Sequence, residues 1–129
     1  QAFIGLKQID NLENYSKIRY DNFLFYVKNI KNNLLKLSDE QFVSNFAFPL
    51  VLNNKNKVVE KLLENNIECR PLIAGSIGLQ PFWIKKYGKL SLKNCDIVHN
   101  NGLYIPNNQK ITIEQIKQIC DIVNNLNGE

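Results

Sequence analysis

The amino-acid sequence predicts an α+β two-layer domain, in which one long N-terminal helix is followed by alternating short strands and helices. Two features of the apolar pattern support this. From residue 3 to about residue 35, apolar side chains recur every three or four positions, which is the period of one helix face. The rest of the 129 residues contains three short apolar runs between helix-like segments, with no internal repeat and no linker. This length suits one domain with its own core.

The N-terminal segment is expected to be a single helix, because no proline interrupts its apolar stripe. The stripe consists of Phe3, Leu6, Ile9, Leu12, Tyr15, Ile18, Phe23, Val27, Ile30 and Leu34. It starts within Gln-Ala-Phe-Ile, with no residue before it that could cap the helix, so we expect further residues upstream of Gln1. The stripe is also wide enough to pack on a partner helix outside the domain, either in a missing half or in an oligomer.

The first strand is expected at Phe46–Leu52, a short apolar run bounded by polar residues. Pro49 cannot donate a backbone hydrogen bond, which favours an edge strand or an entry position. Asn53 and Asn54 then offer caps for a helix. Its core side is expected to carry Val58, Val59, Leu62 and Leu63.

A second strand is expected at Ile67–Ile73, after Asn65 and Asn66 have ended the helix. Pro71 forces the preceding Arg70 into an extended conformation. Strand, helix and strand within about 28 residues form a compact split unit.

The next elements are defined by glycine and proline. Residues 74–78 contain two glycines, which permit a tight turn or a close approach of the backbone to a ligand or neighbour. Pro81 starts a short helix over 81–87 that Gly88 ends. A further helix is expected from about Leu92 to Asn101.

The C-terminal part is expected to hold a strand at 103–105, ended by Pro106, and a last helix. Thr112 is the predicted N-cap of that helix, with Gln115 three residues on as in a capping box. The apolar face of the helix is formed by Ile113, Ile116, Ile119, Cys120 and Val123.

Composition restricts the possible classes of protein. The formal net charge of +4 comes from 14 lysines and only two arginines, beside 20 asparagines. Lysine and asparagine have AT-rich codons, so this charge is a weak argument for any partner. Cys69, Cys95 and Cys120 are too widely spaced for a disulfide framework or a zinc motif, which favours reduced thiols. With no membrane helix and no secretion signal in the sequence, we expect a cytoplasmic protein that binds no membrane.

No established catalytic motif or metal-ligand pattern is present in the sequence, and a single histidine excludes sites that need two imidazoles. Four polar residues stand out in apolar surroundings: Arg70, Ser76, Gln80 and His99. Arg70 suits either a surface ion pair or a bidentate contact to a carboxylate or phosphate. Ser76 is more typical of a turn former, and His99 of a helix-terminal or packing histidine.

A basic segment with aromatic residues lies between positions 83 and 93. It contains Trp83, Lys85, Lys86, Tyr87, Lys89 and Lys93. Such a segment could bind nucleic acid. Without arginine or a second basic patch, we expect instead a solvated face with Trp83 anchored in the core, and we do not expect a nucleic-acid partner.

Three ordered segments resemble the DegT/DnrJ/StrS family of pyridoxal-phosphate-dependent sugar enzymes. They are QAFIGLKQIDNLENYSKIR, ENNIECRPLIAGSIGLQPFW and CDIVHNNGLYIPNNQKITIEQIKQI. The middle segment, with Arg70-Pro71, Gly75-Ser76 and Gln80-Pro81, is similar to the sugar 3-dehydratase branch. The sequence departs from that pattern where Ser76 replaces an asparagine and Leu79 an arginine, and Asn108 occupies a position where the family often has histidine.

The resemblance implies that residues 1–129 form the small C-terminal domain of a fold-type I enzyme, with a small, mainly antiparallel sheet. The cofactor domain would lie upstream of Gln1, together with the lysine of an aminotransferase or the histidine of a 3-dehydratase. Pyridoxal phosphate would bind the complete enzyme, while this chain alone would hold neither a cofactor, a metal nor a catalytic residue. A homodimer is also implied.

The substrate implied by the resemblance is a nucleotide-linked 4-keto-6-deoxyhexose, modified by 3-dehydration in polysaccharide or lipopolysaccharide sugar biosynthesis. Arg70, Ser76, Gln80 and His99 would bind it. Two alternatives remain open: a sugar aminotransferase of the same family, and a stand-alone binding or assembly module that does no chemistry.

Overall fold

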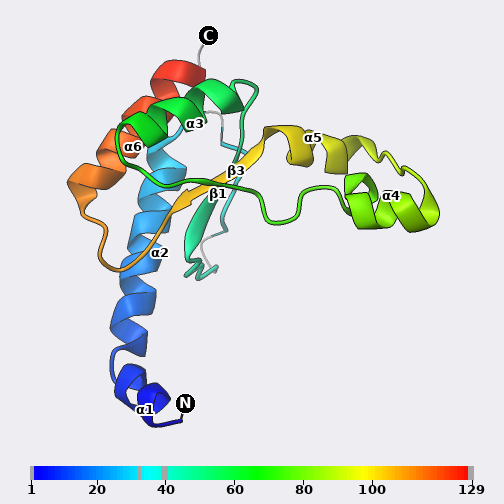
Figure 1. Ribbon diagram of the computed structural model, residues 1–129. Coiled ribbons are helices and arrows are strands. Elements are labelled where there is room, and N and C mark those ends of the chain that lie inside the picture. Colours follow the sequence, from blue (N-terminus) through cyan, green and yellow to red (C-terminus); the bar gives the residue numbers. More distant parts are fainter. Residues whose placement is uncertain (1, 32, 39–40, 128–129) are drawn as a thin grey trace.

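The computed structural model describes residues 2–31, 33–38 and 41–127, and these form six α-helices and a small three-stranded sheet (Figure 1). The elements are α1 (Ala2–Ile9), α2 (Leu12–Asn29), β1 (Ala47–Val51), α3 (Lys55–Glu64), β2 (Arg70–Pro71), the 3-10 turn η1 (Ile77–Leu79), α4 (Pro81–Tyr87), α5 (Lys93–Asn101), β3 (Gly102–Pro106) and α6 (Ile113–Asn127). The architecture confirms the predicted α+β class.

The sheet is antiparallel and has the strand order β1-β3-β2. Because β3 lies between β1 and β2, the segment β1-α3-β2 is the split unit that the sequence predicts. Phe48 pairs with Ile105, and Arg70 pairs with Tyr104. Pro49 lies on β1, an edge strand, as its missing N–H requires.

The hydrophobic core lies between the sheet and helices α2, α3 and α6. Its buried members are Phe23, Tyr26, Ile30, Phe48, Leu50, Leu52, Val58, Leu62, Leu103, Ile105, Ile116, Ile119, Cys120 and Val123. The Tyr26 hydroxyl donates to the carbonyl of Pro106 at 2.9 Å, which joins α2 to the end of β3. Burial raises the pKa of the Tyr26 phenol far above its ordinary value, so this group stays a hydrogen-bond donor.

The prediction of one helix over residues 3–35 is wrong, because the segment is split and shorter. A turn at Asp10 and Asn11, closed by the Asn11 N–H donating to the Gln8 carbonyl at 3.1 Å, separates α1 from α2. At the other end, the Asn33 amide donates to the carbonyls of Val27 and Ile30, both at 2.9 Å. These bonds satisfy helix-terminal carbonyls and so end α2.

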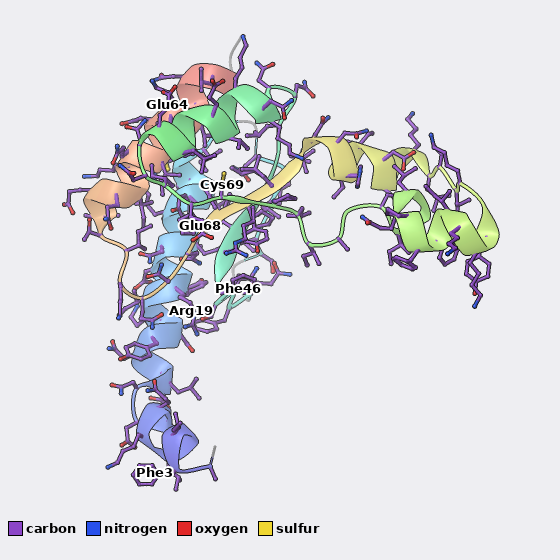
Figure 2. The ribbon with its side chains drawn as sticks, in the orientation of Figure 1. Phe3, Arg19, Phe46, Glu64, Glu68 and Cys69 are labelled. Atoms are coloured by element: carbon purple, nitrogen blue, oxygen red, sulfur yellow. The ribbon has the colours of Figure 1, made fainter. Side chains whose placement is uncertain are left out.

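The N-terminal stripe is therefore buried only in its second half. Phe23 and Ile30 belong to the core, whereas α1 has no buried residue and Phe3 is 73% exposed at the far end of the structure (Figure 2). A partner for α1 stays a prediction.

Several helix boundaries agree with the sequence prediction. In α6 the capping box is present: the Thr112 N–H donates to Gln115 Oε1 at 2.9 Å, and the Gln115 N–H donates to Thr112 Oγ1 at 3.3 Å. Helix α4 begins at Pro81 and ends at Tyr87, with Gly88 as its C-cap at a φ of +80°. Asn65 and Asn66 end α3.

Helix α3 differs from the prediction in two details. Asn54 is at the N-cap position, but its side chain donates to the Leu126 carbonyl at 3.0 Å and caps nothing. Val58 and Leu62 are buried, Val59 is half-buried, and Leu63 is mostly exposed, because only one face of α3 meets α6 and the sheet.

Residues 72–101, here called the arm, extend away from the core and carry η1, α4 and α5 (Figure 1). Helices α4 and α5 contain no buried residue. The prediction that Trp83 is anchored in the core is wrong, because α4 lies on the arm and Trp83 instead packs on Tyr87, with ring centroids 4.7 Å apart. Strand β2 is shorter than the predicted 67–73, since Pro71 has no N–H and Ile73 adopts a φ of +47°.

Candidate ligand site at the base of the arm

A tight turn at Gly75 and Ser76 contacts His99 of α5, and this contact forms the first part of the site. Gly75 has a φ of +61°, and a Cβ at this position would lie 2.2 Å from Nδ1 of His99. The Ser76 N–H donates to that same Nδ1 at 3.2 Å, and Ser76 is only 3% exposed. The glycine therefore allows the imidazole of α5 to lie directly on the turn.

Gln80 connects the turn to α4. It is the N-cap residue of α4, and its Nε2 donates to the Ala74 carbonyl at 2.6 Å. Among the described residues, none engages Gln80 Oε1. This side chain therefore closes the turn with one atom and keeps an acceptor for a ligand.

A cavity of about 520 Å3 lies beside these residues, which is within the size range of small-molecule sites. It is lined by Pro71, Leu72, Ile73, Ala74, Gly75, Ile77, Gln80, Phe82 and His99. Ile73 and Phe82 are 87% and 66% exposed, respectively. The positive φ of Ile73 is a rare conformation for a β-branched residue, and such strain is concentrated at functional sites.

Arg70 lies apart from this cavity. Its guanidinium donates to Oε1 of Glu68 through Nε at 2.9 Å and through Nη2 at 2.5 Å, and both side chains are mostly exposed. This hydrogen bonding holds the pKa of Arg70 above its ordinary value. Arg70 lines a second cavity, of about 290 Å3, together with Phe46, Cys69 and Tyr104; Figure 2 shows Phe46, Glu68 and Cys69 beside the sheet.

The structure thus brings together three of the four residues singled out in the sequence. Ser76, Gln80 and His99 meet at the base of the arm, while Arg70 forms the surface ion pair that was one of its two interpretations. His99 lies in the last turn of α5 and packs on Gly75, as a helix-terminal histidine would.

A carboxylate near the turn was missed by sequence reasoning. The Ser91 hydroxyl donates to Oδ2 of Asp96, and this hydrogen bond lowers the pKa of Asp96. Ile73 and Phe82 were missed as lining residues as well. The sequence signal for Ile73 and Phe82 was weak, because an apolar residue near a turn is normally predicted to lie in the core.

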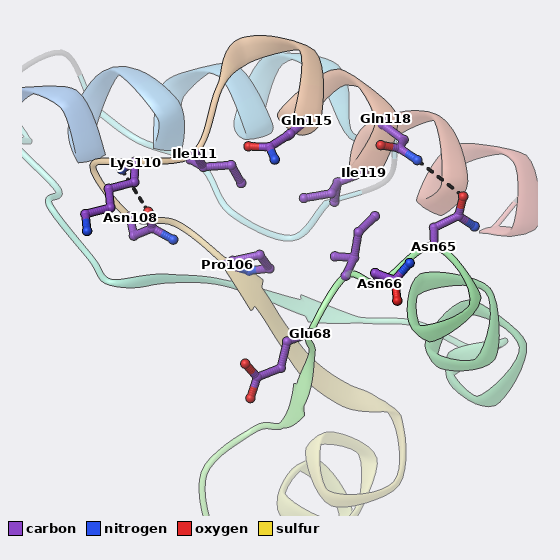
Figure 3. A pocket seen from close by; sticks show the side chains of 11 residues that line it. Asn65, Asn66, Glu68, Pro106, Asn108, Lys110, Ile111, Gln115, Gln118 and Ile119 are labelled. Atoms are coloured by element: carbon purple, nitrogen blue, oxygen red, sulfur yellow. Dashed lines mark hydrogen bonds between the residues drawn. The ribbon is translucent and has the colours of Figure 1, made fainter.

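A third cavity, of about 410 Å3, lies between the end of α3 and the start of α6 (Figure 3). Its polar lining is already paired in part: Gln118 Nε2 donates to Asn65 Oδ1 at 3.2 Å, and the Lys110 N–H donates to Asn108 Oδ1 at 2.8 Å. None of the four residues predicted as binding residues lines it. The base of the arm is therefore the stronger candidate.

Two other kinds of site have no support in the structure. In residues 2–31, 33–38 and 41–127, no group of three or more histidine, cysteine, aspartate or glutamate side chains is placed to hold a metal ion. Within the same residues, no helix combines the length and the apolar character needed to cross a membrane.

Comparison with curated proteins gives relatives of one kind. The chain is 25% identical to GDP-4-keto-6-deoxy-D-mannose 3-dehydratase of Yersinia pseudotuberculosis, over 93% of the chain and 33% of the relative. It is 24% identical to the enzyme of that name from Escherichia coli O55:H7, over 93% of the chain and 34% of the relative. The chain therefore spans about a third of the length of these relatives.

Solved structures share the fold. A sugar aminotransferase from Micromonospora echinospora matches with a TM-score of 0.80 and 15% identity, over 95% of this chain and 33% of that one. The E. coli GDP-4-keto-6-deoxy-D-mannose-3-dehydratase with bound hydrated PLP matches with a TM-score of 0.77 and 22% identity, over 93% and 33%. Residues 1–124 match the DegT/DnrJ/EryC1/StrS aminotransferase family, and the chain belongs to this family.

Proposed function

We propose that this chain is the small C-terminal domain of a larger pyridoxal-phosphate-dependent enzyme that modifies a nucleotide-linked 4-keto-6-deoxyhexose by 3-dehydration. The observation that carries the proposal is the pair of curated relatives, both GDP-4-keto-6-deoxy-D-mannose 3-dehydratases, of which the chain spans about a third. The cavity at the base of the arm supports it, because its apolar walls and few polar groups suit a deoxysugar.

The residues around this cavity do not fit pyridoxal phosphate. That cofactor needs a cradle for its phosphate and ionisable partners at its ring. The cavity lining contains one imidazole but no lysine, arginine or carboxylate. The proposal therefore assigns the cofactor, and the group that reacts with it, to polypeptide outside residues 1–129.

In this proposal the chain's own residues position the sugar. Gln80 Oε1 accepts a hydrogen bond from a sugar hydroxyl, and Phe82 packs against the apolar side of the ring. Ser76 holds the turn, with His99 against it. Arg70, exposed on the neighbouring strand, is assigned to the nucleotide phosphates, which it can reach only by exchanging its bond to Glu68.

A homodimer, a cytoplasmic location and a place in lipopolysaccharide sugar biosynthesis belong to the same proposal. The free thiols of Cys69, Cys95 and Cys120 agree with a reducing compartment. The exposed apolar face of α1 agrees with a domain that packs on further protein.

The test is product analysis with the complete enzyme that contains this chain. The enzyme is loaded with pyridoxal phosphate and incubated with GDP-4-keto-6-deoxy-D-mannose and glutamate, and the same enzyme stripped of cofactor is the control. A product that has lost the C3 hydroxyl supports the proposal. If the product is an amino sugar that keeps this hydroxyl, the aminotransferase alternative replaces the proposal. The absence of any cofactor-dependent product overturns the proposal.

A further inference from the structure

We propose that His99 is held as the tautomer protonated at Nε2 and donates this N–H to an oxygen of the hexose ring, while the diphosphate of the substrate binds elsewhere. This inference rests on the proposed function and deepens it. It names the atom that binds, the part of the substrate that it binds, and the residues that fix it.

The tautomer follows from the hydrogen bond at Nδ1. A backbone amide can only donate, so the Nδ1 that receives the Ser76 N–H at 3.2 Å must present a lone pair. In a neutral imidazole the proton then resides on Nε2. Protonation of both nitrogens would set two donors against each other at Ser76.

The Gly75–Ser76 turn holds the imidazole ring at Nδ1, and a further bond holds the backbone of His99. Gly75 lies so close to Nδ1 that no Cβ fits between them, and the Ser76 amide belongs to a residue that is 3% exposed. The carbonyl of His99 accepts from Lys55 Nζ at 3.4 Å, which ties this end of α5 to α3. His99 is therefore pre-organised before a ligand arrives.

The remaining nitrogen is available to a ligand. His99 lines the 520 Å3 cavity, and Nε2 has no partner among the described residues. His99 and Gln80 both line this cavity, so the two side chains can offer it one donor and one acceptor. This pair matches a hydroxyl group, and the donor alone matches a keto oxygen.

Charge decides which part of the substrate is bound. Apart from His99, no lining residue has an ionisable side chain; the Asp96 carboxylate, one turn earlier on α5, is not part of the lining. Charge-assisted phosphate recognition by side chains relies on arginine or lysine, and neither lines the cavity. The uncharged hexose is therefore the part that fits, and its apolar face can pack on Phe82 and Ile73.

Two substitutions of His99 test the roles of Nδ1 and Nε2 separately. In His99→Asn the amide oxygen replaces Nδ1 as acceptor for Ser76, but no donor reaches the cavity. In His99→Gln the amide nitrogen replaces Nε2 as donor, but the acceptor for Ser76 is lost. Asn100→Ala, an exposed change on the same helix, is the matched control.

The measurements are made on the complete holoenzyme with GDP-4-keto-6-deoxy-D-mannose. We expect His99→Asn to keep the wild-type Tm and to raise KM about tenfold or more, which corresponds to the loss of one hydrogen bond to a ligand. His99→Gln is expected to lower Tm and to keep a KM within about threefold of the wild type. Asn100→Ala should change neither.

Histidine-selective 15N NMR reads the tautomer without any activity. The His99 signal, identified by its loss in His99→Asn, should show an unprotonated Nδ1 and a protonated Nε2, and the Nε2–H resonance should move when GDP-4-keto-6-deoxy-D-mannose is added. A proton on Nδ1, or an unchanged KM in His99→Asn, overturns this inference and leaves the proposed function intact. An enzyme that does not turn over or bind this substrate overturns both.

Discussion

The arm and the rest of the domain, here called the body, differ in how far their apolar residues are buried. In the body, apolar side chains of α2, α3, α6 and the sheet are buried in one core. In the arm, α4 and α5 contain no buried residue, and the buried positions are Ser76 and Gly78 at its base. Phe48 is fully buried, whereas Phe82 is 66% exposed.

This difference indicates where the molecule meets its ligand and its neighbours. A core residue is explained by the contacts it makes within the chain, but exposed apolar residues gathered on one projection need a further explanation. The candidate binding residues lie where the arm leaves the body. We infer that contacts within the body stabilise the fold and that residues of the arm bind the ligand.

The largest expected effect compares two phenylalanines. Phe48→Ala should lower the free energy of unfolding by about 3–5 kcal/mol, because it removes a ring that packs on Phe23 and Tyr26 with centroids 5.0 Å away. Phe82→Ala should change it by less than about 0.5 kcal/mol. Urea denaturation of both variants measures the difference; equal losses would mean that the arm also supports the fold.

A second comparison uses two glycines with positive φ. Gly88→Ala introduces backbone strain alone, since nothing lies within 4 Å of the new Cβ, whereas Gly75→Ala also drives a methyl group into His99. We expect a cost of about 1 kcal/mol for Gly88→Ala, and a larger cost together with weaker substrate binding for Gly75→Ala. Thermal melts and KM values test this; the same KM in both variants would contradict the role of the turn.

A third prediction concerns the pH dependence of the arm. The Ser91 hydrogen bond lowers the pKa of Asp96, so its stabilisation is present above the unfolded-state pKa and is lost as the pH falls through the folded-state value. Ser91→Ala should therefore lower Tm at pH 7 and have no effect once Asp96 is protonated. Melting curves of both proteins from pH 7 to pH 3 provide the check, and a difference independent of pH would refute it.

The smallest effect is a difference in thiol reactivity. Burial raises the pKa of Cys120 to about 11 and also raises that of Cys69, while Cys95 on α5 is exposed. Iodoacetamide at pH 7.5 should label Cys95 first and Cys120 last. Mass spectrometry of the labelled peptides gives the order, and early labelling of Cys120 would show that α6 opens readily.

Much of the body could be predicted from the sequence, because its signals are local. Single residues were enough to predict the capping box of Thr112 and Gln115 and the edge position of Pro49. The split arrangement around α3 followed from the order of short apolar runs and a helix-like segment. The prediction of one long helix was wrong because the apolar spacing continues unchanged across the polar turn at Asp10 and Asn11. An apolar stripe alone therefore does not reveal this turn.

The candidate site could be predicted only in part. Ser76 and Gln80 were indicated by a glycine turn and a following proline, which are sequence signals. The contact between Ser76 and His99 joins residues 23 positions apart, and no local pattern encodes it. Trp83 was misplaced for the same reason, since nothing in its neighbourhood shows that α4 leaves the core.

The most direct test of the central claim is a crystal structure of the complete holoenzyme with a bound nucleotide-linked 6-deoxyhexose. We predict that the hexose lies in the cavity at the base of the arm, with a sugar oxygen within hydrogen-bond distance of His99 Nε2 or Gln80 Oε1. A hexose bound far from this cavity, with the cavity filled by protein side chains, would contradict it.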